Sequence, residues 1–380
     1  MTKTFLSTAA LGAAMMTSSF GGEVDALDAS LINEKKSFWD RFTFGSYGEI
    51  HARFIEKGDF NGTDIDPHRI VLFADFQITD NLKLVTETEL EHALRKNAGS
   101  SSFTSTGVEL KLEQAYLEYA ASETFTAKGG LILTPVGIIN EVHEPTTFYG
   151  VERPNVEKNV IPTTWTVLGL GFTNNVGSDW QFDALFHGGN DTKGGTIRGG
   201  RSSYGIDLFK VNSEGNRFNQ NNSSFAVTGR AKYSGIKNLN LGGSLQYQSD
   251  MDSTTTGSQA GTLGEAHAIY TCGGFQFIAL GTAWNISDVR SEADSQWGYY
   301  LEPSYAWDTP IGKVGVFGRF SQLKYAKLSG SSSATESTEY NLGGNYWINE
   351  NLVVKADYLN EDFKNKDTQK SLNFGFGWYY

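Results

Sequence analysis

The chain has 380 residues and a net charge of −12, and its hydrophobic residues make up only 39% of the total. This acidic balance argues against nucleic acid as a partner, because phosphate binding needs concentrated Lys and Arg. The apolar fraction is small for one large dry core and favours a hollow structure with a wet interior. The single cysteine, Cys272, excludes an internal disulfide.

The first residues have the pattern of a secretory signal. Lys3 provides a positive charge, an apolar run covers residues 5–16, and Val24-Asp25-Ala26 fits a small-x-small cleavage site. A transmembrane helix needs about 20 apolar residues, and neither this run nor a later one is that long. We therefore expect a signal peptide over residues 1–26, with a buried N-terminal helix as the alternative. The exported protein would be soluble or a β-barrel. A weakly helical stretch, residues 27–40, is expected to be a periplasmic lead-in.

Apolar and polar residues alternate in about sixteen segments from about residue 41 to residue 380, as in a strand whose side chains point to two faces. The links between segments alternate between short ones, at 79–81, 121–123, 234–238, 308–313 and 349–351, and long polar ones, at about 55–65, 93–106, 134–163, 188–223, 250–264, 288–296 and 323–337. Outer-membrane barrels have short periplasmic turns and long extracellular loops. The sequence therefore predicts an all-β fold, a transmembrane antiparallel β-barrel of about 16 strands over residues 41–380.

The last ten residues continue this alternation with large rings. Phe374, Phe376, Trp378 and Tyr380 share one face of the predicted strand, and small residues lie between them. Aromatic residues gather at the interfaces of membrane barrels, so we predict that these four form part of a membrane girdle. A soluble sandwich with the rings in its core is the alternative. The last strand should pair with the first, because a barrel leaves no edge unpaired.

Charged residues occupy the polar faces of the strands predicted in NLKLVTETELEHA and GVELKLEQAYLEY. If the leucines face lipid, these charges face a water-filled interior, where their field would tune ion selectivity. The plainer interpretation is that they are solvated residues on a polar face. The predicted pore-lining residues are Lys83, Glu87, Glu89, Glu91, Glu109, Lys111 and Glu113.

The link over residues 134–163 contains more apolar groups, such as Ile138, Ile139 and Phe148, than a solvated loop needs. We predict that it folds into the barrel as a constriction loop. A loop that caps the rim or contacts a neighbouring subunit is the alternative. Its predicted polar constriction residues are Asn140, Glu141, His143, Glu144, Glu152 and Arg153.

Metal, cofactor and catalytic signals are weak. His143 lies between Glu141 and Glu144, but no His-x-x-x-His pair or cysteine cluster accompanies it. None of the six histidines lies in a nucleophile motif such as Gly-x-Ser-x-Gly. We therefore expect no metal, no cofactor, no catalytic residue and no enzymatic activity.

The stretches TELEHA, LEQAYLEY, GLILTPVGIINEVHEPTTFYGVERP and IPTTW resemble the phosphate-selective porin O/P family of Gram-negative bacteria. The resemblance is clearest from about His68 to Thr173. It implies a sixteen-stranded, trimeric outer-membrane porin whose inward loop forms the eyelet. Phosphate-selective members carry a ladder of lumenal arginines and lysines, whereas this chain has Glu87, Glu89 and Glu113 on the expected lumenal faces. The solute stays open between phosphate, a cation, a sugar and small polar solutes in general.

The expected function is passive diffusion of small hydrophilic solutes or ions across the outer membrane of a Gram-negative cell. The expected partners are outer-membrane lipid, the barrel-assembly machinery and two further copies in a homotrimer. The alternatives are an exported adhesin, a soluble binding sandwich, or a barrel-embedded enzyme.

Overall fold

Most of the described chain forms antiparallel strands. The structure is a computed structural model that describes residues 38–92, 109–188, 225–251, 260–287, 294–325 and 334–380. A short 3-10 helix, η2 (Phe38–Arg41), precedes the first strand. The strands of the described residues are β1 (Phe42–Lys57), β2 (Phe60–Thr79), β3 (Leu82–Glu91), β4 (Glu109–Ala120), β5 (Phe125–Leu133), β6 (Thr166–Val176), β7 (Trp180–His187), β8 (Ala226–Ile236), β9 (Leu239–Gln248), β10 (Gly261–Cys272), β11 (Phe275–Ile286), β12 (Ser295–Thr309), β13 (Gly312–Tyr325), β14 (Thr335–Asn349), β15 (Leu352–Phe363) and β16 (Gln369–Tyr379).

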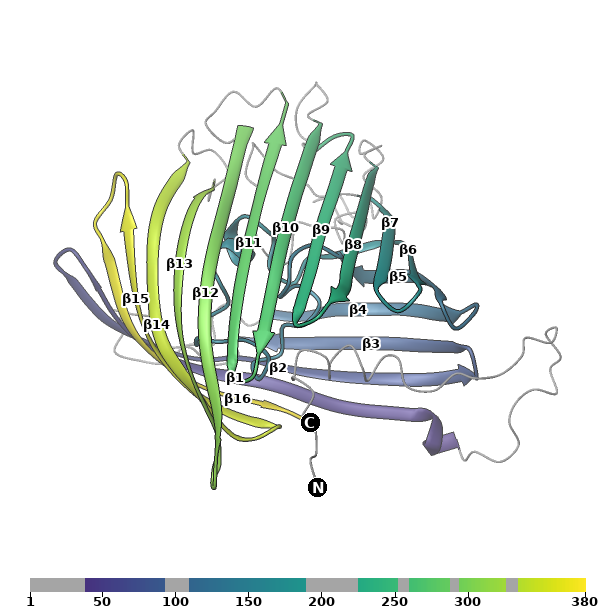
Figure 1. Cartoon of the computed structure of the whole chain (residues 1–380), viewed down its shortest axis with the longest axis horizontal. Helices are drawn as coiled ribbons and strands as arrows, with labels where there is room; N and C mark the ends of the chain where they lie inside the picture. Colours follow the sequence, from purple (N-terminus) through teal and green to yellow (C-terminus); the bar gives the residue numbers. More distant parts are fainter. Residues whose placement is uncertain (1–37, 93–108, 189–224, 252–259, 288–293, 326–333) are drawn as a thin grey trace, which may run out of the picture.

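The sheet closes into a barrel because the last strand pairs with the first. Each strand is hydrogen bonded to its neighbours in sequence, and β16 runs beside β1 with Phe376 opposite Ile50. At the end of this seam the backbone groups of Ser46 and Tyr380 exchange hydrogen bonds of 2.8 and 2.7 Å. In Figure 1 the strands β8 to β12 stand upright, and β1 to β4 run across the lower part of the barrel. The predicted closed barrel of about 16 strands is confirmed.

The two faces of the sheet differ in chemistry. Large apolar side chains stay exposed on the outer face, where Leu72 and Leu342 are 61% and 63% exposed, and Phe182 and Tyr247 are exposed as well. The residues that alternate with them are largely polar and buried on the inner face, as in β12 and β14. A barrel that is apolar outside and polar inside is the transmembrane form, because lipid satisfies no polar group.

One predicted long link is wrong. Residues 55–65 belong to β1 and β2, which continue to a tight turn at Gly58 and Asp59. Gly58 has φ 55°, a conformation that glycine adopts without a steric penalty. The short links at 79–81, 121–123 and 349–351 join strands as predicted.

Several sequence predictions fall outside the described residues. They include the signal peptide over residues 1–26, most of the lead-in over residues 27–40, and the greater part of the long links apart from the one between β5 and β6. Of the lead-in, the structure describes the residues of η2, which packs its Phe38 ring against Phe76 of β2 at 5.7 Å.

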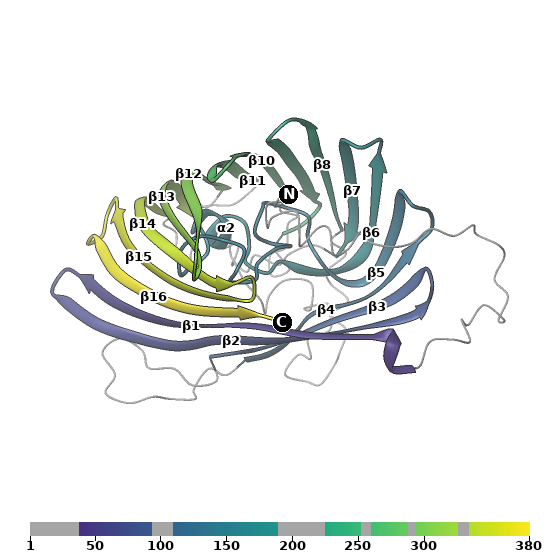
Figure 2. The ribbon, with the colours of Figure 1, turned by 60° about the horizontal axis from the view of Figure 1, so that its bottom comes forward.

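The link between β5 and β6 lies against the inner wall, and we call residues 134–165 the interior segment. Figure 2 shows its short helix, α2 (Val156–Asn159), within the curve of the strands. The segment's apolar residues, including Val156 and Trp165, form one cluster with Trp284 of β11 and Leu323 of β13. No helix in the described part of the chain has the length and apolar content needed to cross a bilayer.

Candidate functional site in the barrel interior

The second half of the interior segment is held by apolar packing on one inner wall. Trp165 lies 5.9 Å from Trp284, measured between ring centroids, and both side chains are 1% exposed. The indole N–H of Trp284 donates to the Val160 carbonyl at 3.0 Å. Val156 of α2 packs over Gly298 of β12. A Cβ at position 298 would lie 3.1 Å from a methyl group of Val156. This wall therefore has a dry core in place of a wet lumen.

A single carboxylate links the start of the segment, its helix and the wall. Glu157 Oε2 accepts hydrogen bonds from the backbone N–H groups of Ile138 and Ile139, each at 2.7 Å. Its Oε1 accepts the hydroxyl of Tyr300 on β12 at 2.7 Å. Burial raises the pKa of Glu157 above its ordinary value. Gly137 has φ 78°, and a Cβ there would lie 2.7 Å from this carboxylate. A side chain at this position would therefore displace the anchor.

The middle of the segment is tied to the wall through its backbone. Strands β13 to β15 supply the donors: Arg319 donates to the Tyr149 carbonyl at 2.7 Å, and Lys355 donates to the Gly150 carbonyl at 2.9 Å. Asp357 accepts the N–H of Val151 at 2.6 Å. Buried polar backbone needs such partners, because an unmade hydrogen bond costs about 1–3 kcal/mol. The charged residues of this wall thus form hydrogen bonds with the backbone of the segment and do not line an open lumen.

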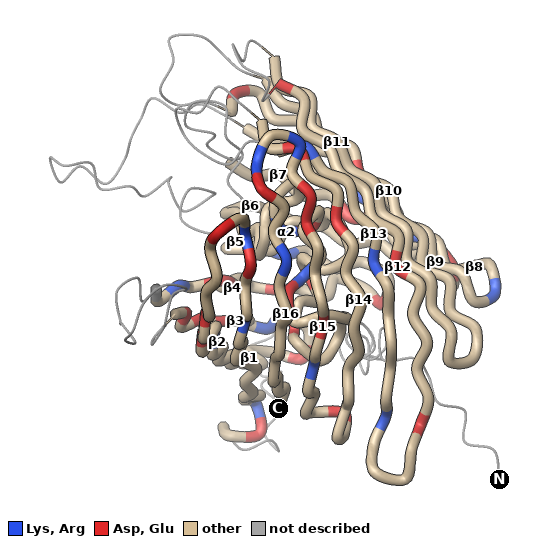
Figure 3. The backbone as a smooth tube through the Cα atoms, turned by 90° about the vertical axis from the view of Figure 1, so that its left-hand side faces the viewer, with Lys and Arg blue, Asp and Glu red and all other residues tan. Residues whose placement is uncertain are grey.

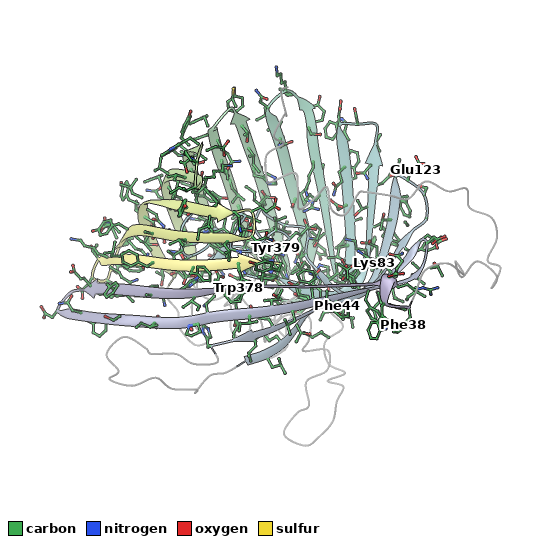
Figure 4. The ribbon with its side chains drawn as sticks, turned by 90° about the horizontal axis from the view of Figure 1, so that it is seen from below. Phe38, Phe44, Lys83, Glu123, Trp378 and Tyr379 are labelled. Carbon is green, nitrogen blue, oxygen red and sulfur yellow. The ribbon has the colours of Figure 1, made fainter. Side chains whose placement is uncertain are left out.

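The small residues of the last strand make room for the interior segment. A Cβ on Gly377 would lie 2.5 Å from Pro145, and one on Gly375 would lie 3.1 Å from Val151. Between them Phe376 points outward with 38% of its surface exposed. Figure 4 labels Trp378 at the end of this strand. The alternation at the C-terminus therefore serves lipid on one side and the interior segment on the other.

Charged side chains connect the segment to β1 and β2. Arg69 is buried and donates to Glu49 Oε1 and to the His143 carbonyl, both at 2.7 Å. Glu152 lies 3.3 Å from Nδ1 of His51 and 2.6 Å from Nζ of Lys158. Burial by itself would raise the pKa of Glu152, but the attraction of Lys158 and His51 outweighs it and holds this pKa well below its usual range.

A compact polar cluster joins His143 to β1, β3 and β4. The Tyr47 hydroxyl lies 2.5 Å from Glu87 Oε1 and 2.7 Å from His143 Nε2, and Glu113 Oε2 lies 3.8 Å from the same nitrogen. His143 donates through Nδ1 to the Asn140 carbonyl at 2.9 Å. Burial, together with Arg153 and Arg69, holds the pKa of His143 well below its usual value, so the imidazole is neutral.

Most of the predicted pore-lining residues are on the inner face but are not open to water. Glu87 and Glu113 are buried in the cluster around His143, and Glu89 and Glu91 are fully buried. Lys111 lies 3.2 Å from Glu91. On β4, Glu109 is opposite Glu91 in the strand register. The sequence predicted a wall of acidic residues open to water, whereas most of these acidic side chains are buried.

Charged side chains with partial exposure lie on the inner face of β2 to β5. Lys83 lies 3.4 Å from Asp75 and 3.6 Å from Glu118, and Lys128 lies 3.4 Å from the same Glu118. Each of these four side chains is between 21% and 25% exposed. Figure 3 shows basic and acidic positions side by side on these strands. This face offers both signs of charge to a solute.

The same mixture continues at Glu141 of the interior segment. Glu141 pairs with Arg230 of β8, which also donates to Asp183 of β7 at 2.8 Å. Burial opposes ionisation of Glu141, but Arg230 and Lys232 lower its pKa to about 2, so the carboxylate stays charged. Its side chain keeps 33% exposure. Glu141 is thus a predicted constriction residue with a charged group at an accessible position.

The other predicted constriction residues have different environments. Asn140 closes the base of the segment by accepting the Trp165 N–H at 2.7 Å and donating to the Thr134 carbonyl at 2.8 Å. Arg153 is buried and donates to Thr164 at 3.0 Å. Burial raises the pKa of Glu144 to about 7.

Sequence reasoning missed the strand residues that hold the segment. They are Tyr47, Arg69, Arg319, Lys355 and Asp357, together with Glu157 in the segment itself. Each occupies a polar position of an alternating strand or a short helix and carries no local motif. A basic residue within a largely apolar strand, such as Arg319 in KVGVFGRFS, was the available signal.

Two groups of side chains among the described residues have the atoms to bind a metal ion. Glu87, Glu113 and His143 form one group, and Asp66, His68 and His92 form the other. Within each group the potential ligand atoms lie within 4.8 Å of one another. No local motif predicts the first group, because Glu87, Glu113 and His143 lie on β3, β4 and the interior segment.

Comparison with known proteins shows which known structures share this fold. No family model matches the chain. An uncharacterized protein of Aquifex aeolicus is 28% identical over 366 residues, which cover 89% of this chain and 80% of that protein. OprB of Pseudomonas putida superposes with a TM-score of 0.59 at 10% identity, over 89% of this chain and 94% of that one.

Other similar structures are an anion-selective porin from Comamonas acidovorans and a trimer form of OmpT from Vibrio cholerae. The first has a TM-score of 0.56 at 11% identity and covers 89% of this chain and 99% of that chain. The second has a TM-score of 0.52 at 12% identity and covers 90% and 100%. These comparisons do not identify the chain as a member of the phosphate-selective porin O/P family. The chain has the sixteen-stranded barrel fold of outer-membrane porins.

Proposed function

We propose that the protein is an outer-membrane porin that lets small hydrophilic solutes and ions diffuse passively through its barrel. The observation that carries the proposal is the closed barrel with exposed apolar side chains outside and buried or half-buried polar side chains inside. A wall of this kind separates lipid from water and serves no purpose in a soluble sandwich. The trimer form of OmpT, which has the same fold, supports a homotrimer.

The interior segment is the proposed constriction. It contacts the strands β1, β2, β4, β8, β9 and β11 to β15 through hydrogen bonds and close pairs of charged or polar side chains, so it narrows the lumen. Partly exposed charged side chains also occur at Arg53, Glu152 and Lys158, but those on β2 to β5 are grouped on one inner face, and Glu141 adds a further partly exposed charge. We place the solute path along this face.

The proposed path carries lysines and carboxylates in similar number, so the ion selectivity should be weak. Lys83 and Lys128 alternate there with Asp75 and Glu118. Mixed charge of this kind admits ions of both signs and neutral polar solutes. A phosphate-selective path would instead need basic groups without these carboxylate partners.

Reconstitution of the purified barrel in planar bilayers tests the proposal. We expect stepwise ohmic conductance and, under a KCl gradient, a permeability ratio of K⁺ to Cl⁻ within about threefold of unity. Liposome swelling with neutral sugars should show uptake that falls with sugar size. A barrel that assembles, as judged by heat-modifiable migration on gels, but neither conducts nor admits sugars would contradict the channel function.

A further inference from the structure

A second cluster, formed by Asp66, His68 and His92, lies apart from the proposed path, where the interior of β2 pairs with the end of β3. Asp66 and His68 belong to β2, and His92 directly follows β3. Asp66 is 2% exposed, whereas the side chains of His68 and His92 are 18% and 19% exposed. A small ion can therefore approach the two imidazoles while the carboxylate beneath them stays shielded.

A β-bulge turns His68 toward Asp66. Glu49 pairs with Arg69 and the next residue of β1 pairs with Pro67, so His68 is an extra residue in β2. Bulges re-aim side chains and are found next to functional sites. His68 Nδ1 lies 3.1 Å from Asp66 Oδ2, and its ring stacks on the buried ring of His51 at 4.7 Å between centroids.

A second irregularity brings His92 to the same carboxylate. His92 has φ 48°, in the left-handed region that few residues other than glycine adopt. Its backbone N–H donates to the His68 carbonyl at 3.0 Å. Its Nδ1 then lies 3.0 and 2.8 Å from the two oxygens of Asp66. A residue keeps such an unfavourable backbone conformation only where the surrounding structure enforces it, and residues of this kind are concentrated at functional sites.

We propose that Asp66, His68 and His92 bind a divalent transition-metal ion. One carboxylate and two imidazoles suit Zn²⁺ and similar ions, whereas Ca²⁺ and Mg²⁺ prefer oxygen ligands alone. Bonds of about 2.0–2.2 Å in a tetrahedral site place ligand atoms about 3.3–3.6 Å apart. The distances of 2.8 to 3.1 Å from Asp66 to the imidazoles need to widen by about 0.2–0.8 Å, and the two imidazole nitrogens, which lie within 4.8 Å of each other, need only side-chain adjustment to meet one ion. The remaining coordination position is open to water or a passing solute.

The other group of potential ligands is a poorer site. Glu87, Glu113 and His143 are all buried. The Tyr47 hydroxyl lies between them, at 2.5 Å from Glu87, 2.7 Å from His143 and 3.4 Å from Glu113. A hydrogen-bonded hydroxyl thus fills the position that an ion would need.

Metal titration of the full chain, folded in detergent and stripped with a chelator, tests the proposal. We expect calorimetry to show one Zn²⁺ ion bound per chain with micromolar or tighter affinity, and excess Ca²⁺ to leave it bound. Co²⁺ should give visible absorption bands that Zn²⁺ abolishes. Absence of Zn²⁺ binding by the folded wild-type chain, or displacement of Zn²⁺ by Ca²⁺, overturns the proposal.

Two variants locate the site. His92→Asn retains a residue that tolerates the left-handed conformation, and His68→Asn removes the other imidazole. Each should weaken Zn²⁺ binding by at least about 10–100-fold, the loss usual even for a supporting partner of a ligand. His267→Asn is the matched control, since His267 also contacts an inner-face carboxylate, Glu265, at 2.6 Å. Zn²⁺ affinity that is unchanged in both folded variants, or lowered equally in the control, overturns the proposal.

Discussion

Glu157→Ala should release the interior segment from the wall and enlarge the channel. The carboxylate accepts three hydrogen bonds, two from the backbone of Ile138 and Ile139 and one from Tyr300, each at 2.7 Å. The change leaves three buried donors without an acceptor. At about 1–3 kcal/mol for each buried donor, the loss is at least about 3 kcal/mol.

Such a loss changes the balance between docked and released segment by about two orders of magnitude, because about 1.4 kcal/mol corresponds to a factor of ten. Single-channel recording should therefore show a higher mean conductance with larger current fluctuations. Limited proteolysis should cut the interior segment faster than in the wild-type barrel.

Glu157→Gln and Tyr300→Phe are the matched controls. The amide oxygen of Gln still accepts the two backbone N–H groups, and Tyr300→Phe removes one hydrogen bond while leaving the carboxylate. Both should retain conductance near that of the wild type. In a double-mutant cycle, Tyr300→Phe should add little to Glu157→Ala, since they share one interaction. A Glu157→Ala barrel with wild-type conductance and proteolysis would refute the anchoring role of this carboxylate.

Three further predictions concern residues that face the inside of the barrel. Lys128→Glu combined with Lys232→Glu should raise the ratio of K⁺ to Cl⁻ permeability by about two- to fivefold, measured from reversal potentials, and an unchanged ratio would place the solute path elsewhere. The pKa of Glu144 is raised to about 7 by burial, so its carboxyl is neutral below and ionised above that pH. Cation preference should then increase between about pH 6 and pH 8, and Glu144→Gln should abolish that step. Gly377→Leu introduces a side chain whose Cβ would lie 2.5 Å from Pro145, and it should displace the segment and alter conductance, whereas the outward substitution Phe376→Leu should not.

The alternation of side chains determined the barrel from the sequence. A strand places successive residues on opposite faces, so residues such as Leu372, Phe374 and Phe376 identify an apolar outer face without any knowledge of the fold. The short links at 79–81 and 349–351 could be read in the same local way. These signals depend on neighbours in sequence, which is why the closed barrel was predicted.

Local pattern failed where a residue's role depends on a distant partner. Glu87 and Glu113 have the alternation of lumenal residues, but Tyr47 and His143 cover them. The stretch at 55–65 is polar and contains glycine, which predicted a loop, although pairing between β1 and β2 extends the ladder through it.

The sequence by itself thus determined which face meets lipid, because that choice repeats every second residue. Only the tertiary structure decided what fills the barrel. The interior segment meets its hydrogen-bond partners across up to 206 positions, as between Val151 and Asp357. The bulge at His68 and the backbone of His92 bring two imidazoles to Asp66. Val151 and Asp357 become neighbours only when the barrel encloses the interior segment, whereas Asp66, His68 and His92 meet through the pairing of β2 with β1 and β3. The alternation of apolar and polar residues predicts a barrel but specifies neither set of contacts.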